Sequence, residues 1–481
     1  MKKRTKILAT IGPASDTLEM IENLIHAGVN VFRLNFSHGT YEYHLNVLKK
    51  IRKAMQNTGL VVGVLQDISG PKIRIGDLEE NFDLVENDTI VFHKDTILGK
   101  KTAKSLYEVS INHPKILAQL NIDDYIYLYD GIIRTKVIEI SDNGVKVLVE
   151  NNGILSSKKG VNFPNTALGI DVLTDKDRRD MAWGVENNVD FMAISFVQEA
   201  KDMINAREVV NKLGGKQMLI AKIEKFDAIE NIDEILAESD GLMVARGDLG
   251  IEVPYYEVPN LQKMLIQKAN QASKPVITAT QMLLSMTHSQ RATRAEISDI
   301  SNAVKDGTDA VMLSEESAVG KHPALAVNTM FETIRETEKE YDYFQFQTIK
   351  CHDDTNAIDE AAVRLAGDLH ADGILSITAS GNSARNLAKY RPSNTIYAIT
   401  HDSTVRQQLT LTWGVVPAFS VKKGSFGKTI HEVMQKGLND DVLSLEKSYI
   451  LTAGDPVGVS GSTNTIRLLR EEEMKFFKNL S

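Results

Sequence analysis

Short runs of Val, Ile and Leu recur along this chain, and each is followed by a longer amphipathic stretch. This alternation is typical of β-α units around a parallel sheet, whose strands are covered by helices on both faces. It predicts eight strands, at Lys6–Gly12, Val29–Ser37, Leu60–Asp67, Asp190–Val197, Gln217–Glu224, Gly241–Asp248, Pro275–Gln281 and Ala310–Glu316. Helices are predicted between them, at Thr17–Ala27, Tyr41–Asn57, Lys201–Leu213, Val258–Ser273 and Thr293–Asp306. Eight such units are the number that closes a TIM (β/α)8 barrel.

The spacing of the strands breaks once, between Asp67 and Asp190. Alternating apolar residues and turn signals in this interval predict short strands at Asp88–Asp95, Tyr125–Asp130, Ile132–Ile140 and Gly144–Val149. We therefore expect a small β-barrel domain inserted after the third barrel strand. Its hinges are expected at Gly70-Pro71 and at Phe163-Pro164-Asn165.

A second α/β pattern follows the polar segment Gln345–Thr355. Its strands are predicted at Ile374–Ala379, Thr395–Thr400, Val415–Val421 and Ser448–Thr452. We expect three domains: a barrel at 1–70 and 171–344, an inserted lid at 71–170, and a C-terminal α/β regulatory domain at 345–481. A chain of 481 residues with 42% hydrophobic residues is long and apolar enough for cores in all three.

The charge balance excludes several classes of partner. The chain has 55 Lys and Arg against 64 Asp and Glu, a net charge of −9. Nucleic acids and anionic membranes bind mainly to basic faces, so we expect neither as a partner. The single cysteine, Cys351, permits no intrachain disulfide and has no role that the sequence identifies. With no long apolar run, the sequence predicts a soluble cytoplasmic protein.

Polar residues gather at the C-terminal ends of the predicted barrel strands, where barrel enzymes carry their chemistry. Side chains alternate along a strand, so residues two apart share a face. The sets that share a face are Arg33, Asn35 and Ser37; Lys222 and Glu224; Arg246 and Asp248; Thr278 and Thr280; and Ser314 and Glu316. Charges in buried strands cost several kcal/mol unless they are paired or liganded. Together these polar sets therefore predict one functional site at the C-terminal ends of the barrel strands.

The charge types narrow the chemistry of that site. Glu224 and Asp248 supply the hard oxygen ligands that Mg²⁺ prefers, and Lys222 and Arg33 add positive charge beside them. This combination stabilises a phosphoryl group in transfer. It would equally suit an enolate next to a carboxylate, so the residues alone leave both open. The amides of Gly247-Asp248-Leu249-Gly250 suit an anion.

Long motifs along nearly the whole chain resemble the pyruvate kinase family. They are Thr10-Ile-Gly-Pro-Ala-Ser15, Arg33-Leu-Asn-Phe-Ser-His-Gly39, Gly70-Pro-Lys-Ile-Arg74, Ser157-Lys-Lys-Gly-Val-Asn162, Lys222-Ile-Glu224, Met243-Val-Ala-Arg-Gly-Asp-Leu-Gly250, Ala279-Thr-Gln-Met282 and Thr293-Arg-Ala-Glu296. The resemblance implies transfer of the phosphoryl group of phosphoenolpyruvate to ADP, giving pyruvate and ATP. It also implies a homotetramer.

The resemblance assigns roles to individual residues. Mg²⁺ (or Mn²⁺) would be held by Glu224 and Asp248. The phosphoryl group would be stabilised by Lys222 and Arg33, and the substrate carboxylate would be held by the amides of Gly247 and Asp248 with Thr280. Nucleotide contacts would come from Arg74, Lys159, Pro13, His38 and Tyr43. Thr280 and Ser314 are candidates for a water-mediated relay that protonates the enolate.

One position departs from the family pattern. Many relatives hold K⁺ with residues corresponding to Asn35, Ser37, Asp67 and the Ile68 carbonyl, and carry Glu where this chain has Lys72. We hypothesise that the Lys72 ammonium takes the place of K⁺, so that activity does not require that ion. The alternative is that Lys72 is an exposed hinge lysine.

In the C-terminal domain, the resemblance identifies the segment with Thr378, Ser380, Gly381, Asn382 and Ser383 as an effector loop. Hydroxyls and amides before a helix, here predicted at Ser383–Tyr390, suit a phosphate. An ordinary N-cap by Ser380 or Ser383 is the competing interpretation. Because the late loop Gly454–Asn464 has no Lys or Arg, we expect a sugar monophosphate or AMP, or no effector, over fructose 1,6-bisphosphate.

Two other functions stay open from the residues. One is a Mg²⁺-dependent barrel lyase or mutase acting on phosphoenolpyruvate or an oxoacid enolate, which would need neither the inserted domain nor Lys159. The other is an inactive metabolite sensor that uses only the C-terminal loop. The sensor predicts damage among Arg33, Lys222, Glu224, Asp248 and Thr280, and the sequence has none.

Overall fold

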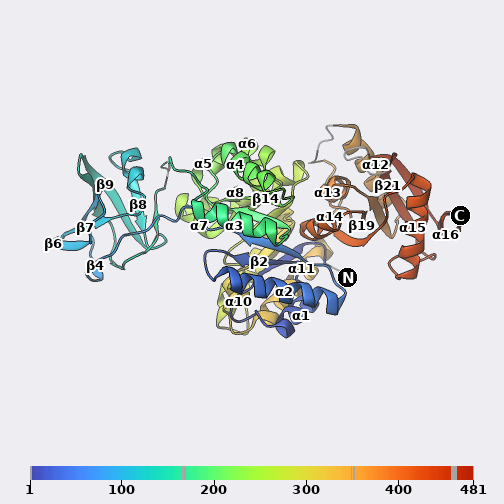
Figure 1. The fold of residues 1–481 in the computed structure, drawn as a ribbon, viewed down its shortest axis with the longest axis horizontal. Coiled ribbons are helices and arrows are strands. Elements are labelled where there is room, and N and C mark those ends of the chain that lie inside the picture. Colours follow the sequence, from blue (N-terminus) through green and yellow to red (C-terminus); the bar gives the residue numbers. More distant parts are fainter. Residues whose placement is uncertain are drawn as a thin grey trace.

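Eight parallel strands close into the predicted barrel at the centre of the molecule (Figure 1). The computed structural model describes residues 3–164, 166, 169–347, 349, 353–456 and 463–479. The strands are β1 (Lys6–Thr10), β2 (Val31–Asn35), β3 (Gly63–Asp67), β13 (Phe191–Ile194), β14 (Met218–Ile223), β15 (Gly241–Ala245), β16 (Val276–Ala279) and β17 (Ala310–Leu313). Their order around the barrel is β1-β17-β16-β15-β14-β13-β3-β2. All eight predicted strands are confirmed, each with a shorter span than predicted.

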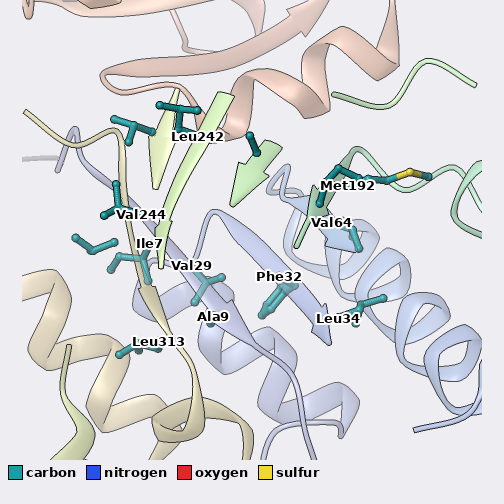
Figure 2. Packing of buried hydrophobic residues seen from close by; sticks show 14 of the residues in the cluster. Ile7, Ala9, Val29, Phe32, Leu34, Val64, Met192, Leu242, Val244 and Leu313 are labelled. Atoms are coloured by element: carbon teal, nitrogen blue, oxygen red, sulfur yellow. The ribbon is translucent and has the colours of Figure 1, made fainter. Parts of the chain in front are cut away.

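Helices surround this barrel and cover its outer surface. They are α1 (Leu18–Ala27), α2 (Tyr41–Thr58), α3 (Asp175–Glu186), α4 (Ala200–Lys212), α5 (Phe226–Glu230), α6 (Ile232–Glu238), α7 (Arg246–Glu252), α8 (Val258–Gln271), α9 (Arg294–Asp306), α10 (Glu315–Ala318) and α11 (Pro323–Thr337), with 3-10 turns η2 (Tyr255–Glu257), η3 (Leu284–Thr287) and η4 (Glu338–Glu340). Figure 2 shows Ile7, Phe32, Leu34 and Leu313 among the buried side chains of the strand–helix core. A separate inner cluster, which includes Leu8, Val31 and Met312, fills the barrel.

Local sequence signals fix where helices begin and end. Thr293 begins α9 with a capping box, in which its hydroxyl accepts from the Glu296 amide and the Glu296 carboxylate accepts from the Thr293 amide. Gly28 ends α1 at φ 113°, and a Cβ there would lie 2.6 Å from the Phe331 ring. Only glycine satisfies both demands without strain.

The inserted domain, the lid, lies at one end of the molecule (Figure 1). Its main sheet has the order β12-β8-β9-β10-β5-β7-β6, and β11 pairs with β4. The strands are β4 (Phe82–Leu84), β5 (Thr89–His93), β6 (Lys100–Ala103), β7 (Leu106–Ser110), β8 (Tyr125–Leu128), β9 (Ile133–Ser141), β10 (Gly144–Val149), β11 (Gly153–Leu155) and β12 (Val161–Asn162), with a 3-10 turn η1 (Pro114–Gln119). The four predicted strands are present. The sequence missed the others because they are short or, like β6, exposed throughout.

The C-terminal domain lies at the opposite end of the molecule (Figure 1). Its sheet has the order β20-β19-β18-β21-β22, with β18 (Gly373–Ile377), β19 (Thr395–Thr400), β20 (Val415–Ser420), β21 (Tyr449–Gly454) and an antiparallel β22 (Thr463–Leu469). Its helices are α12 (Asp354–Asp368), α13 (Asn382–Lys389), α14 (Ser403–Gln408), α15 (Phe426–Asn439) and α16 (Glu471–Lys478), with a 3-10 turn η5 (Leu409–Leu411). The sequence missed β22, whose side chains are largely polar. Cys351 and Asn165 lie outside the described residues.

Buried polar contacts tie the C-terminal domain to the barrel. Arg391, 2% exposed, pairs with Asp309 at 3.2 Å and donates to the Gly307 carbonyl at 2.6 Å. Asp309 also accepts from the Trp413 amide at 2.9 Å. No helix in the described part of the chain combines the length and apolarity needed to cross a bilayer.

Candidate functional site

The barrel places Arg33, Asp67 and Lys222 on its inner face, as strand alternation predicts. Val31 and Leu65, which share a face with Arg33 and Asp67, lie in the inner cluster, as does Ile220, which shares a face with Lys222. The polar ends of β2, β3 and β14 therefore converge at the carboxyl mouth of the barrel. Ser314 directly follows β17, as the N-cap of α10, at the same mouth.

The alternation argument is wrong for the sixth and seventh strands. Leu242, Val244 and Val276 pack outward against the helices, whereas Met243 and Ile277 lie inside the barrel. Strand β15 ends at Ala245, and the polar residues after it belong to α7 instead of a strand. A change to helical backbone resets the two-residue period, so parity carries no information beyond the end of a strand.

Arg246 does not point into the barrel mouth as a residue of the sixth strand. It begins α7, and its guanidinium pairs with Asp299 at 2.7 Å and donates to the Thr280 carbonyl at 2.7 Å. Its charge is therefore neutralised behind the mouth, and it holds the segment after β16. Glu316, also predicted on a strand face, lies in α10 and accepts from the amides of Leu283 and Ser314.

Lys222 lies at the centre of the charged cluster. Its Nζ is 2.8 Å from Glu224 Oε1 and 3.1 Å from Asp67 Oδ1, and it donates to Ser195 Oγ at 2.7 Å. Burial would lower the pKa of Lys222, but attraction to Asp67 and Glu224 outweighs burial and raises it. The ammonium is thus a permanent positive charge.

Arg33 approaches the same carboxylate from the other side. Its Nε is 2.7 Å from Asp67 Oδ2, and its Nη1 donates to Thr10 Oγ1 at 3.0 Å. Burial would raise the pKa of Asp67, which is 2% exposed, but Lys222 and Arg33 together lower it. One buried anion therefore positions two cations.

Two further carboxylates lie close to the ends of the neighbouring strands β14 and β15. Glu224 follows β14 directly and accepts from the Phe196 amide at 3.0 Å, while Asp248 lies in the first turn of α7. Burial and repulsion from Glu224 raise the pKa of Asp248 to about 6. A divalent cation between them would relieve this repulsion. Among the described residues no group of three or more His, Cys, Asp and Glu forms a metal site, so water and substrate would complete the shell.

The start of α7 and the segment after β16 form one wall of a neighbouring cleft. The Gly247 amide donates to Thr280 Oγ1 at 2.8 Å, and Thr280 has a left-handed φ of 70°. Gly247, Asp248, Thr280 and Ser314 all line a cleft of ≈ 740 Å³, together with Asp130 of the lid. The predicted carboxylate-binding and relay residues are therefore close together.

The predicted nucleotide residues are brought together only in part. Burial and the nearby charges of Lys72, Arg74 and Arg33 lower the pKa of His38, so these four groups are neighbours. Lys159 lies in the lid with its Nζ 4.0 Å from the centroid of the Tyr129 ring. Arg74 and Gly160 form a β-bridge at the hinge, which pairs the backbone of Arg74 with that of the residue after Lys159.

Tyr43 and Pro13 come from two other segments of the barrel domain. Tyr43 is on α2, where burial and the nearby Asp16 raise its pKa to about 12. Pro13 is exposed in the loop after β1.

Three of the four candidate K⁺ ligands, Asn35, Asp67 and Ile68, have partners within the protein. Asn35 Oδ1 accepts from the Ser37 amide at 3.1 Å, and the Ile68 carbonyl accepts from the Ser195 hydroxyl at 2.7 Å. Lys72 is half-buried, not exposed. Burial and the nearby charges of Arg74 and Lys222 lower its pKa, while Asp67 and Asp248 oppose this shift.

The C-terminal loop between β18 and α13 is held by its own polar groups. Thr378 Oγ1 accepts from the Gly381 amide at 2.9 Å, and the Ser383 hydroxyl bonds that of Thr463. Gly381, at φ 85°, is the N-cap of α13. The interpretation of Ser380 or Ser383 as an N-cap is therefore wrong. Ser380 and Asn382 both accept from Arg385. Residues 457–462 of the late loop lie outside the described residues.

Thr10 and Ser195 are site residues that the sequence interpretation missed. Thr10 links Arg33 to the Leu313 carbonyl of β17, and Ser195 links Lys222 to the Ile68 carbonyl. Each follows or ends a barrel strand at the mouth, which is the signal that would have found them.

Comparisons with known proteins extend over almost the whole chain. The family profile described as "Pyruvate kinase, barrel domain" matches residues 2–327, and "Pyruvate kinase, alpha/beta domain" matches residues 356–469. A pyruvate kinase of Sporosarcina psychrophila is 40% identical over 474 residues, covering 97% of this chain and 80% of that protein. One of Agrobacterium vitis is 40% identical over 471 residues, covering 97% and 98%. A crystal structure of a pyruvate kinase from Cryptosporidium parvum has a TM-score of 0.90 at 35% identity, covering 97% and 96% of the chains.

Proposed function

The chain belongs to the pyruvate kinase family, and on this basis we propose a role for each residue of the site. The family reaction transfers the phosphoryl group of phosphoenolpyruvate to ADP and gives pyruvate and ATP, in glycolysis. The observation that carries our proposal is the position of Lys222, 2.8 Å from Glu224 and 3.1 Å from Asp67. A fixed cation beside a carboxylate pair suits a step that depends on positioning and charge neutralisation.

Lys222 and Arg33 would hold the phosphoryl oxygens. Both cations are already oriented by Asp67, so little reorganisation is needed when charge develops on the transferring group. Lys222 would act most strongly in the transition state, and Arg33 would fix the phosphate in both ground and transition states. This division explains why two cations share one buried anion.

Glu224 and Asp248 would hold the divalent metal that the family requires, Mg²⁺ or Mn²⁺. Support comes from the repulsion that raises the pKa of Asp248, since a cation is the natural partner for two buried carboxylates. When bound, the metal supplies charge neutralisation at the phosphoryl group. The amides of Gly247 and Asp248, with Thr280, would orient the carboxylate of phosphoenolpyruvate.

The nucleotide would enter between the barrel mouth and the lid. Arg74 and Lys159 are proposed to bind its phosphates, and Pro13, His38 and Tyr43 to lie near it. Closure of the lid over the mouth would exclude water, which competes with ADP as acceptor of the phosphoryl group. Thr280 and Ser314 are proposed to return a proton, through water, to the enolate.

Lys72 is proposed to replace the K⁺ ion used by many relatives. Its attraction to Asp67 and Asp248 supports an ammonium at the edge of the charged cluster, against burial and the charges of Arg74 and Lys222, which lower its pKa. The Asn35, Ser37, Asp67 and Ile68 oxygens would then need no monovalent ion.

Regulation and assembly are also proposals. We propose that Thr378, Ser380, Gly381, Asn382 and Ser383 bind the phosphate of a sugar monophosphate or AMP, supported by the position of the loop at a strand-to-helix turn. A cytoplasmic homotetramer follows from family likeness. We propose the domain limits 1–70 with 171–344, 71–170 and 345–481, supported by hydrophobic clusters that lie mainly within each of the three parts.

One assay tests whether the protein catalyses phosphoryl transfer from phosphoenolpyruvate to ADP, on which the proposed residue roles depend. Purified protein is mixed with phosphoenolpyruvate, ADP and Mg²⁺, and pyruvate is measured with coupled lactate dehydrogenase. We expect pyruvate formation that depends on both ADP and the metal. Pyruvate or a rearranged acid formed without ADP would favour the lyase or mutase, and no turnover would favour the sensor.

A further inference from the structure

Lys225 is a buried lysine that the reaction chemistry above does not use. It follows Glu224 directly in the sequence and is 2% exposed. A lysine is almost never buried to this degree unless its ammonium has partners. Its neighbour in the chain is a proposed metal ligand, so whatever holds Lys225 also constrains the loop that carries Glu224.

Glu252 is the ionic partner of Lys225. It is 3% exposed, and its carboxylate pairs with the Lys225 ammonium. Glu252 is the last residue of α7, the helix whose first turn carries Gly247 and Asp248. The pair therefore joins the loop after β14 to the far end of the short helix that supplies the second carboxylate.

The same ammonium also reaches the lid. Lys225 Nζ donates to the Phe163 carbonyl at 3.2 Å. Phe163 directly follows β12, the last strand of the lid, and is fully buried. A second contact lies nearby, because a Cβ on Gly131 of the lid would be 3.4 Å from Ile251, the neighbour of Glu252. Three chain segments thus meet at one buried charge pair.

Stability alone is a weak reason for such a pair. Replacing a buried ion pair with apolar residues is often neutral or stabilising, since the desolvation of two charges offsets their attraction. An apolar pair at 225 and 252 could pack, but it could not donate a hydrogen bond to the Phe163 carbonyl. The three donors of an ammonium can hold a carboxylate and a carbonyl together in fixed directions.

We propose that Lys225 and Glu252 are positioning residues that hold the return strand of the lid in register with the Glu224 and Asp248 loops. This inference rests on the proposed function. Lys225 touches neither substrate nor metal; it acts by fixing where the lid closes. Loss of its bond to Phe163 lets the lid, with Lys159, close out of register with the mouth. ADP then binds less well, and water reaches the phosphoryl group more often.

The test uses the full chain with the substitutions Lys225→Met, Glu252→Gln and both together. Lys225→Met is expected to raise the KM for ADP roughly tenfold and to lower kcat by 10- to 100-fold, the range for a misplaced catalytic group. Binding of phosphoenolpyruvate is expected to change less than about threefold, because Lys222 and Arg33 are untouched. Glu252→Gln retains an acceptor and the Phe163 bond, so its KM for ADP should stay near that of the unsubstituted protein.

A second measurement detects attack of water on phosphoenolpyruvate in place of ADP. In the unwanted reaction, a water oxygen attacks phosphorus and the bond from phosphorus to the enolate oxygen breaks. The products are inorganic phosphate and the enolate of pyruvate, which takes a proton and becomes pyruvate. We expect ADP-independent release of phosphate to rise, relative to transfer, in Lys225→Met. The control is Lys274→Met, which removes another lysine that bonds backbone carbonyls, those of Leu236 and Ala237, away from the lid.

The double variant Lys225→Met with Glu252→Gln distinguishes a role in positioning the lid from a role in stability alone. It leaves no unpaired buried charge, so its Tm should recover toward that of the unsubstituted protein while its KM for ADP stays high. Recovery of both Tm and KM in the double variant would overturn the proposal, as would an unchanged KM in Lys225→Met. If the unsubstituted protein shows no ADP-dependent transfer, the proposed function fails instead, and the two failures are distinguishable.

Discussion

The barrel mouth and the C-terminal domain each bury an aspartate, with opposite results. Asp67, 2% exposed, lies between Arg33 and Lys222, and these cations lower its pKa. Asp359, fully buried on α12, has its pKa raised to about 8 by burial, which Asn386 and Lys389 offset only in part. Burial is common to both, and the neighbouring cations decide the charge.

This difference separates two kinds of site. At the mouth, buried charges are paired at 2.7 to 3.1 Å and remain ionised, which suits electrostatic catalysis. In the C-terminal domain, the loop at Thr378–Ser383 has no charged side chain of its own, and it is held by hydroxyls, amides and the neighbouring Arg385 guanidinium. A fixed field acts on a developing charge, whereas this neutral loop, so called because residues 378–383 carry no charge, offers hydroxyls and amides to a ligand that brings its own charge.

The largest effect is expected from Lys222→Met, which removes the central cation and keeps the length of the side chain. Turnover should fall by roughly 10³-fold or more, because an electrostatic group at a phosphoryl transition state contributes on that scale. Phosphoenolpyruvate should still bind, since Arg33 and the Gly247 segment remain. The coupled assay measures kcat, and titration calorimetry measures binding. Near-normal turnover would show that the mouth does not work by a fixed field.

Asp67→Asn tests the pairing itself. It leaves Lys222 and Arg33 without their shared anion, and breaking a buried ionic network costs about 3–5 kcal/mol. The free energy of unfolding, from urea denaturation, should fall by that amount. The matched control is Asp77→Asn, which removes an ion pair with Lys158 whose side chains are 66% and 58% exposed; such pairs contribute about 0–1 kcal/mol. Equal effects of the two variants would contradict the comparison.

Asp359→Asn tests the other buried acid through pH. The folded-state pKa of about 8 lies above the ordinary value of 3.8, so between these values the folded protein holds a proton that the unfolded chain releases. Stability therefore falls as pH rises from about 4 to about 8, by at most ~1.4 kcal/mol per pH unit from this group. Asp359→Asn should flatten the dependence of Tm on pH over this window. The exposed Asp368 on the same helix serves as control, and Asp368→Asn should leave the slope unchanged.

Lys72→Glu restores the residue that many K⁺-dependent relatives carry. We expect the unsubstituted protein to be active with only tetramethylammonium as the monovalent cation. The variant should lose about tenfold activity without K⁺ and regain it when K⁺ is added, a factor that corresponds to ~1.4 kcal/mol. Stimulation of the unsubstituted protein by K⁺ to the same extent would refute the replacement of the ion by Lys72.

Much of the fold could be predicted because its signals are local. The buried runs at Thr395–Thr400 and Gly144–Val149 coincide with β19 and β10, since apolar composition and turn residues fix them. Strand β6, Lys100–Ala103, is exposed at every residue and carries no such pattern. It forms because β7 offers it an edge, which is a tertiary cause.

The sequence predicts which charged residues form the site, but it predicts less well how their side chains are arranged. Lys222 follows from alternation within β14, but Glu224 lies just beyond that strand and Asp248 lies in α7, where strand alternation no longer applies. Ser195 was missed because its role depends on Lys222 lying 2.7 Å away on the neighbouring strand. Contacts between strands distant in sequence require the closed barrel, which no single segment encodes.

The smallest effect is expected at the neutral loop of the C-terminal domain. Glucose 6-phosphate, ribose 5-phosphate or AMP should lower the KM for phosphoenolpyruvate by roughly 5- to 20-fold, within the usual range of allosteric coupling. Fructose 1,6-bisphosphate should act more weakly, because the late loop Gly454–Asn464 offers no Lys or Arg to a second phosphate. Ser383→Ala should abolish the response and leave the basal rate unchanged, since Ser383 bonds Thr463 far from the barrel mouth. A stronger response to the bisphosphate would mean that charge outside this loop completes the effector site, and the contrast between a charged mouth and a neutral loop would no longer hold.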